Sequence, residues 1–132
     1  SDIPVFSFHP VKIMTTAEGG MAVTNAPDLA QKMELLRSHG ITRDPEQMTQ
    51  EPDGPWFYQQ IELGYNYRMT ELQAALGLSQ LERLDAFVAR RHELAKRYAR
   101  LLADLPVTLP WQHPEAYSAL HLYPIRLQLD TE

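Results

Sequence analysis

A single lysine, Lys12, stands between a short apolar run and a glycine-ended polar loop. The apolar run, residues 3–8, is rich in β-branched and aromatic residues and predicts a strand, and residues 20–24 predict a second one. Lys12 is therefore expected in a connection between two strands, at the rim of a sheet. A lysine amine condenses with a carbonyl only when neutral, so a reactive lysine needs a site that disfavours its charge. Loops on a rigid sheet often carry such groups, although most lysines are simply solvated.

The elements that follow are punctuated by glycine and proline. Residues 25–28 combine asparagine, proline and aspartate, which is typical of a helix N-terminus. Apolar residues spaced by four and three then predict a helix over residues 27–38, with Gly40 as its stop. Residues 41–56 predict a proline-broken polar loop. The aromatic cluster at residues 56–58 would be exposed in an isolated chain and would favour association.

A second helix is expected to begin at a capping box formed by Thr70 and Gln73, in which each side chain bonds the other residue's amide. We expect one long helix to about Ala103, with a kink near Asp85. Gly77 costs about 1 kcal/mol against alanine inside a helix, so we interpret it as a point of close approach to another element. The predicted apolar stripe of this helix comprises Leu81, Leu84, Val88, Ala95, Tyr98 and Leu102.

The C-terminal part predicts a helix end and one strand. Glu93 and Arg97 have the i,i+4 spacing of a supporting ion pair. Proline at position 106 cannot extend the helix, and alternation over residues 121–129 predicts a half-buried strand. Pro124 would place that strand at an edge or a bulge.

Composition excludes several classes of function. The 132 residues carry a net charge of -5 and contain no cysteine. General affinity for nucleic acid is therefore not expected, and disulfide or thiolate chemistry is excluded. No run approaches the ~18 apolar residues of a membrane span. No signal peptide is evident, so we expect a cytoplasmic protein without membrane attachment. The five histidines are scattered, and we expect no metal site.

Four segments together resemble the DegT/StrS family of sugar aminotransferases. They are Ser-Phe-His-Pro-Val-Lys-Ile-Met-Thr-Thr-Ala-Glu-Gly-Gly-Met at residues 7–21, Gly-Tyr-Asn-Tyr-Arg-Met-Thr-Glu-Leu-Gln-Ala-Ala at residues 64–75, His-Gly at 39–40, and His-Leu-Tyr-Pro-Ile at 121–125. The resemblance covers nearly the whole chain. It implies a pyridoxal-phosphate enzyme of the aspartate-aminotransferase fold.

The resemblance also implies a fold class and a division of the chain. Members of the family are roughly three times longer, so the chain is expected to be a fragment with an α/β fold, or α+β when taken alone. Residues 1–68 would form the C-terminal part of the cofactor-binding large domain and include a β-hairpin. Residues 69–132 would comprise the linking long helix and the first strand of the small C-terminal domain.

By resemblance, Lys12 forms the Schiff base with pyridoxal phosphate and moves the proton between substrate carbon and cofactor. A dehydrating relative has histidine at this position, so lysine favours transamination. Ser7 would donate its hydroxyl to the cofactor phosphate, and Asn66 would bind that phosphate across a dimer interface. The alternatives are a strand hydroxyl bonded to backbone for Ser7 and a turn asparagine for Asn66.

Other polar residues have two open interpretations. Arg68 could hold a substrate diphosphate with two parallel hydrogen bonds, or it could brace its loop by bonding backbone carbonyls. His9 lies near the lysine but could equally be a packed loop histidine. His39 is expected to cap a helix C-terminus, and Glu18 to belong to a glycine turn.

The expected function of the full-length enzyme is transfer of an amino group from glutamate to a nucleotide-linked sugar. Within the family, His-Pro-Val-Lys most resembles the branch that aminates C4 of a UDP-linked 4-keto-6-deoxy-N-acetylhexosamine, in pseudaminic-acid-type biosynthesis. The enzyme would be a homodimer. The alternatives are another nucleotide-sugar aminotransferase or, for the isolated chain, a non-catalytic helical module that self-associates.

Overall fold

The computed structural model describes residues 1–129, which divide into two compact units. The first unit comprises residues 1–7 and 19–74. The second comprises residues 8–18 together with the chain from residue 75 onward.

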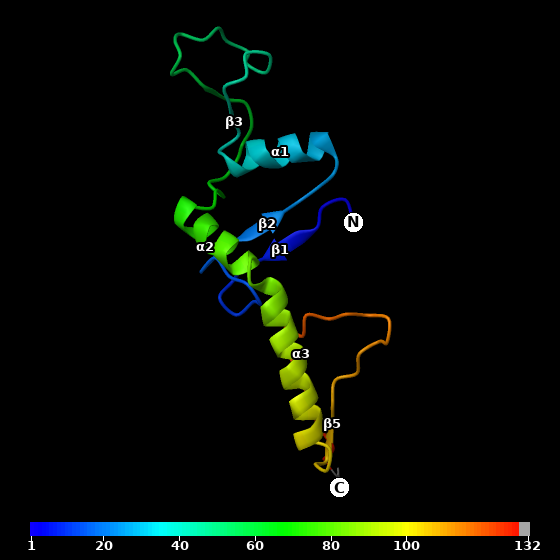
Figure 1. Cartoon of the computed structure of the whole chain (residues 1–132). Coiled ribbons are helices and arrows are strands. Elements are labelled where there is room, and N and C mark those ends of the chain that lie inside the picture. Colours follow the sequence, from blue (N-terminus) through cyan, green and yellow to red (C-terminus); the bar gives the residue numbers. More distant parts are fainter. Residues whose placement is uncertain (130–132) are drawn as a thin grey trace. The chain divides into compact units, whose positions relative to one another are not determined.

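The first unit begins with a β-hairpin. Strands β1 (Val5–Ser7) and β2 (Gly20–Ala22) pair antiparallel, with Ser7 opposite Gly20 (Figure 1). Both strands lie within the predicted segments, and the pairing is shorter than residues 3–8 and 20–24 would allow. Gly20 is close to its partner strand, because a Cβ there would lie 2.8 Å from the Phe6 carbonyl oxygen.

Helix α1 (Pro27–Arg37) confirms the predicted helix and its proline at the first position. The predicted asparagine cap is wrong, since Ala26 is the N-cap residue and no side chain caps the helix. The predicted stop is also present, since Gly40 lies just beyond the helix and its N–H donates to the Leu35 carbonyl at 2.8 Å. Both His39 and Gly40 have left-handed backbone angles, with φ of 64° and 69°.

The predicted loop over residues 41–56 begins as a strand instead. Strand β3 (Ile41–Thr42) pairs antiparallel with β4 (Gln59–Gln60), and Thr42 is buried. The sequence does not predict this pairing, because a strand of two residues is too short to show the alternation of apolar and polar residues that indicates a strand.

Helix α2 (Glu71–Leu81) starts at the predicted capping box. The Thr70 hydroxyl accepts the Gln73 N–H at 3.3 Å, and Gln73 Oε1 accepts the Thr70 N–H at 2.9 Å. The single long helix predicted from here to Ala103 is wrong, because a separate helix α3 (Leu84–Leu101) follows.

The break between the helices has a local cause. The Arg83 N–H donates to the carbonyl of Gln80, a bond that spans three residues rather than four. Arg83 has φ of -106° and ψ of 2°, outside the helical range. The tightened turn ends α2, and the break lies just before the kink expected near Asp85.

Helix α3 keeps most of the predicted stripe half-buried, and Tyr98 is exposed. The predicted ion pair is corrected, because Glu93 pairs with Arg90 at 2.6 Å, three residues earlier, instead of with Arg97. Both spacings bring side chains together on a helix, so sequence alone could not choose between them.

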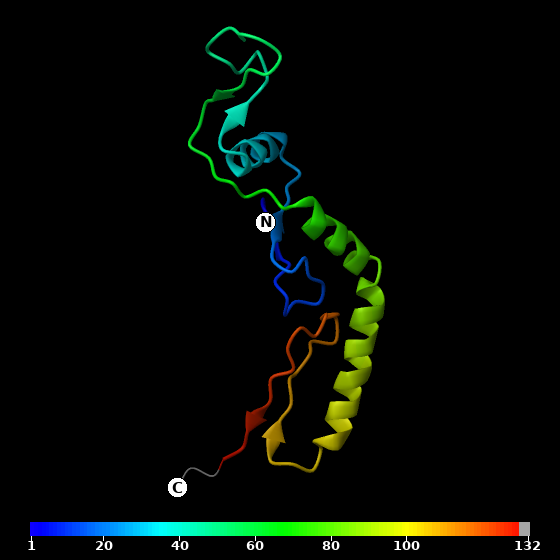
Figure 2. The same ribbon diagram turned by 90° about the vertical axis from the view of Figure 1, so that its left-hand side faces the viewer.

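The C-terminal segment returns beside α3 (Figure 2). Strand β5 (Val107–Thr108) pairs antiparallel with β6 (Arg126–Leu127), so the predicted strand over residues 121–129 is much shorter in the structure. Two side chains of α3 bind the segment that precedes β6. Arg91 donates to the Leu120 and His121 carbonyls, and the His92 ring nitrogen Nε2 lies 2.8 Å from the Ser118 carbonyl.

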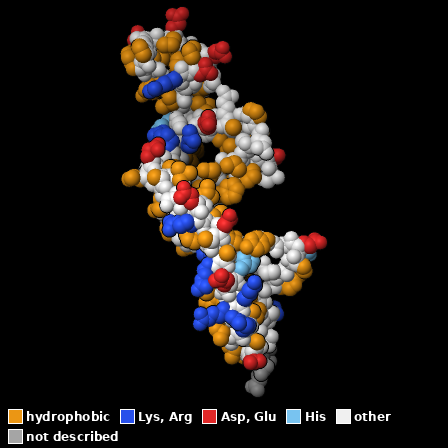
Figure 3. All heavy atoms as spheres, in the orientation of Figure 1, with side chains coloured by type: hydrophobic (Ala, Val, Ile, Leu, Met, Phe, Trp, Pro, Cys, Tyr) orange, Lys and Arg blue, Asp and Glu red, His pale blue; other side chains and the backbone are white. Residues whose placement is uncertain are grey.

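Burial is sparse in the described part of the chain. Among residues 1–129, Leu120 is the one buried hydrophobic side chain, and many large apolar side chains are exposed (Figure 3). Exposed apolar area on this scale indicates surfaces that other parts of a protein cover. No helix in residues 1–129 is long and apolar enough to cross a membrane.

The capping box generates a test of the fold. Replacing Thr70 with alanine removes the acceptor of the Gln73 N–H, and we expect a loss of about 0.5–2 kcal/mol in the free energy of unfolding. Urea unfolding of the chain measures this loss, and faster amide exchange of Gln73 would locate it. Ser79→Ala, an exposed site in the same helix, is the control and should change stability by less than about 0.5 kcal/mol.

Candidate functional site

Lys12 lies in a loop that closes on itself within the second unit. The Lys12 N–H donates to the His9 carbonyl at 2.9 Å. The Phe8 carbonyl accepts two bonds, from the Thr16 N–H at 3.0 Å and from the Thr15 hydroxyl at 2.9 Å. The backbone that carries the lysine is therefore tied at both ends by hydrogen bonds.

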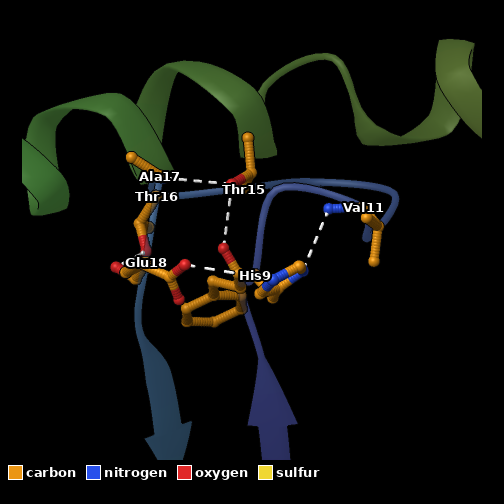
Figure 4. Close-up of polar contacts among 7 residues, drawn as sticks. His9, Val11, Thr15, Thr16, Ala17 and Glu18 are labelled. Carbon is orange, nitrogen blue, oxygen red and sulfur yellow. Dashed lines mark hydrogen bonds and ion pairs between the residues drawn. The ribbon is translucent and has the colours of Figure 1, made fainter.

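Two adjacent threonines complete this loop (Figure 4). The Thr15 hydroxyl accepts the Ala17 N–H at 3.0 Å, and the Thr16 hydroxyl donates to the Glu18 carbonyl at 2.7 Å. These bonds support a turn in which Ala17 has a left-handed φ of 69°. Nothing in the sequence analysis singled out the threonines, although their position just after the lysine is a signal that could have done so.

His9 serves the loop backbone. Its Nδ1 accepts the Val11 N–H at 3.3 Å, and its Nε2 lies 3.9 Å from Glu18 Oε1 (Figure 4). Accepting at Nδ1 places the imidazole proton on Nε2, which is the nitrogen that faces the carboxylate. The His9 side chain is exposed and bonds the loop backbone, so the structure does not show the packed histidine that was one of the two interpretations.

The Lys12 side chain is half-buried and pairs with no carboxylate in residues 1–129. A primary amine is the side-chain group that forms a Schiff base with an aldehyde, and here it is carried by an ordered loop. The residue therefore fits a carbonyl cofactor on its own chemistry.

The loop contacts α2 through Thr16. Thr16 is 1% exposed, and a Cβ at Gly77 would lie 2.8 Å from Thr16 Cγ2. The sequence prediction of a close approach at Gly77 is confirmed, and its partner is the loop that bears Lys12.

Ser7 is the last residue of β1, and its side chain is exposed. Within residues 1–129 its hydroxyl makes no hydrogen bond to the backbone. The hydroxyl is therefore available to an acceptor outside the described chain.

Asn66 and Arg68 lie on a segment that runs along the C-terminal end of α1. Asn66 forms an isolated β-bridge with Ser38, and the Tyr67 N–H donates to the Arg37 carbonyl at 3.0 Å. The rings of Tyr65 and Tyr67 stack with centroids 5.0 Å apart. These contacts hold the backbone on either side of Asn66 in place.

Arg68 borders a hollow of about 290 Å³. Arg43 also lines it, and its guanidinium lies 6.0 Å from the centre of the Tyr58 ring. Within residues 1–129 Arg68 lies at this hollow together with Ser38 and His39. Two arginines at one hollow provide donors suited to an anion. Arg43 is a residue that the sequence analysis did not select.

The four predicted site residues fall in different units. Lys12 belongs to the second unit, whereas Ser7, Asn66 and Arg68 belong to the first. Neither unit alone brings the lysine together with the proposed phosphate donors. The donor set itself, an amine with a hydroxyl and an amide, is chemically suited to an aldehyde that carries a phosphate.

Comparison with known proteins identifies the family. The family model of the DegT/DnrJ/EryC1/StrS aminotransferases matches residues 1–132, and the chain belongs to this family. A Campylobacter jejuni relative named UDP-4-amino-4,6-dideoxy-N-acetyl-beta-L-altrosamine transaminase is 39% identical over 128 residues, 96% of this chain and 32% of the relative. The chain thus spans about a third of the length of its curated relatives.

Solved structures agree with the fold. Helicobacter pylori PseC, an aminotransferase of pseudaminic acid biosynthesis, matches with a TM-score of 0.82 and 39% identity, over 96% of this chain and 32% of that one. The sugar aminotransferase Spr1654 of Streptococcus pneumoniae in its PMP-form matches with a TM-score of 0.83 and 34% identity, over 97% and 33%. A PLP-form of the same protein also matches. The mixed α/β fold class expected from the sequence is confirmed.

The turn after α1 generates a prediction for the Asn66 segment. A Cβ at Gly40 would lie 2.0 Å from the Glu62 carbonyl oxygen, and φ there is +69°. We expect Gly40→Ala to cost more than about 2 kcal/mol of unfolding free energy and to expose the Tyr65 amide, which donates to Leu36. Urea unfolding and amide exchange measure both effects.

The adjacent His39 supplies the matched control for that variant. His39 also has a positive φ. His39→Gly relieves the backbone strain of the folded state, but it also raises the conformational entropy of the unfolded chain. Because these two effects oppose each other, the free energy of unfolding should change by no more than about 1 kcal/mol. Equal losses of unfolding free energy in Gly40→Ala and His39→Gly would contradict a special requirement for glycine at position 40.

Proposed function

We propose that this chain is the lysine-bearing part of a pyridoxal-phosphate-dependent nucleotide-sugar aminotransferase. The observation that carries the proposal is Lys12, which lies in a closed loop and pairs with no carboxylate in residues 1–129, within a chain that matches the aminotransferase family over residues 1–132. Its structural relatives include one solved in PLP- and PMP-forms. That relation supports the same cofactor here.

The bound cofactor would supply the electron sink for cleavage of a C–H bond. Lys12 Nζ would hold the cofactor and then move the proton between the substrate carbon and the cofactor. The Ser7 hydroxyl and the Asn66 amide would donate hydrogen bonds to the phosphate. Arg68 would hold the substrate diphosphate with its guanidinium fork.

The substrate is proposed from the named relatives. Three are called UDP-4-amino-4,6-dideoxy-N-acetyl-beta-L-altrosamine transaminase, and PseC acts in pseudaminic acid biosynthesis. We propose amination of C4 of a UDP-linked 4-keto-6-deoxy-N-acetylhexosamine, with glutamate as the donor. A spore coat polysaccharide biosynthesis protein of Bacillus subtilis is 38% identical, so another sugar of this class is the alternative.

The proposal includes assembly and domain division. The enzyme would be a cytoplasmic homodimer in which Asn66 enters the partner's site. Residues 1–68 would belong to the large domain and residues 69–132 to the link and the small domain. The alternative of a self-associating helical module loses support, because its stripe required one continuous helix and the chain has two.

The role of Lys12 can be tested in the full-length polypeptide that carries this segment. Lys12→Ala should lower transamination by roughly 10²–10⁴-fold or more, since both cofactor attachment and proton transfer are removed. Lys32→Ala, at a surface lysine that pairs with Glu62, is the control and should retain activity. Turnover by the Lys12 variant near that of the control would refute the assignment.

The placement of Asn66 in the partner's site can be tested by mixing two inactive variants. Lys12→Ala and Asn66→Asp subunits should each be inactive alone, the second because a carboxylate repels the phosphate. A mixed dimer regains one intact site if the two residues come from different subunits. An equal mixture should then recover up to about a quarter of wild-type activity, whereas sites built within one subunit would recover none.

A further inference from the structure

One contact in the second unit joins the lysine loop to a helix. Thr16 is the one fully buried residue of the loop over residues 8–18, and Gly77 is the one buried residue of α2. The distance of 2.8 Å from a Cβ at Gly77 to Thr16 Cγ2 is shorter than carbon atoms tolerate. The helix therefore has room for the threonine methyl group only because residue 77 has no side chain.

The contact reaches Lys12 through backbone hydrogen bonds. Thr16 donates its N–H to the Phe8 carbonyl, which closes the loop around the lysine, and Lys12 donates its own N–H to the His9 carbonyl inside that closure. The Thr16 hydroxyl is occupied by the Glu18 carbonyl. The methyl group is thus the part of Thr16 that meets the helix, while its polar groups hold the loop.

Thr16 is more buried than the residues of the loop before it. His9, Pro10 and Val11 are exposed, and the residues from Lys12 to Thr15 are only half-buried. Opening of the loop must therefore break the buried contact of Thr16 with α2.

We propose that Thr16 and Gly77 are positioning residues that set the place of the Lys12 amine by fastening its loop to α2. The inference rests on the proposed function for the use of that amine, but the fastening itself requires no cofactor. An α2 residue would thereby control a reactive group more than sixty positions earlier in the sequence.

The test is a pair of variants that should compensate each other. Gly77→Ala places a methyl group against Thr16 Cγ2, and Thr16→Ser removes that carbon while keeping the hydroxyl for Glu18. We expect Gly77→Ala to speed amide exchange of Lys12 and Thr16 by about tenfold or more. Thr16→Ser alone removes the methyl group that meets the helix and should speed both rates by about fourfold. In the double variant the alanine methyl group takes the vacated space, and both rates should return to within about twofold of wild type. Ser79→Ala in the same helix controls for the added helix propensity.

A second measurement reports on the amine itself. Acetylation of Lys12, quantified by peptide mass spectrometry relative to the exposed Lys96 on α3, should rise about threefold or more in Gly77→Ala and fall back in the double variant. A general loss of structure would instead speed the amides of α3 as well. In that event the double variant decides. If it restores the exchange rates of both the lysine loop and α3, the proposal is supported, and if it does not restore them, the proposal is overturned.

Unchanged exchange in Gly77→Ala, or a double variant that is not restored, would overturn the inference. Neither readout involves pyridoxal phosphate. If Gly77→Ala and Thr16→Ser compensate each other while Lys12→Ala keeps full turnover, the positioning role stands and the proposed function is rejected. Failure of the positioning role can therefore be distinguished from failure of the proposed function.

Discussion

The absence of a side chain at Gly77 is the constraint on which the lysine loop depends. The surface of α2 at that point accepts the methyl group of Thr16, and the buried threonine then holds the closure of the loop through Phe8. Steric exclusion of this kind is steep, since a distance below 3 Å between carbons is strongly repulsive whereas ordinary contact near 4 Å is weakly attractive. One missing methyl group therefore decides whether the loop can lie against the helix.

The first unit depends on a comparable close approach at a different place. Gly40 ends α1 in a left-handed conformation, and its missing Cβ leaves room for the Glu62 carbonyl. The His39 N–H then donates to the Tyr65 carbonyl, and the Tyr65 N–H donates to the Leu36 carbonyl at the end of the helix. Asn66 and Arg68 follow directly, so their backbone is placed by hydrogen bonds that Gly40 permits. In both units a glycine allows a close approach, of the Glu62 carbonyl at Gly40 and of the Thr16 methyl group at Gly77, next to a segment that carries a residue of the proposed site.

The thin core of the described chain agrees with its coverage of about a third of its relatives. Apolar side chains of the hairpin and of the aromatic segment around Trp56 remain exposed. The hydrophobic effect favours covering such surface, and the relatives possess a further two-thirds of chain. The local hydrogen bonds of the loop and of the α1 turn are already formed without it, because each joins residues that are close in sequence or held by a glycine contact.

The sequence by itself determined the family, the hairpin, the start and stop of α1, the capping box and the close approach at Gly77. These features rest on short-range rules, in which residue type and spacing act within one or two turns of chain. Tertiary structure alone decided the break at Arg83, the pairings of β3 with β4 and of β5 with β6, and the choice of Arg90 over Arg97 as the partner of Glu93. It also decided that Thr16 is the residue beneath Gly77. Each of these depends on which distant atoms compete for the same space or hydrogen bond, and no local pattern records that competition.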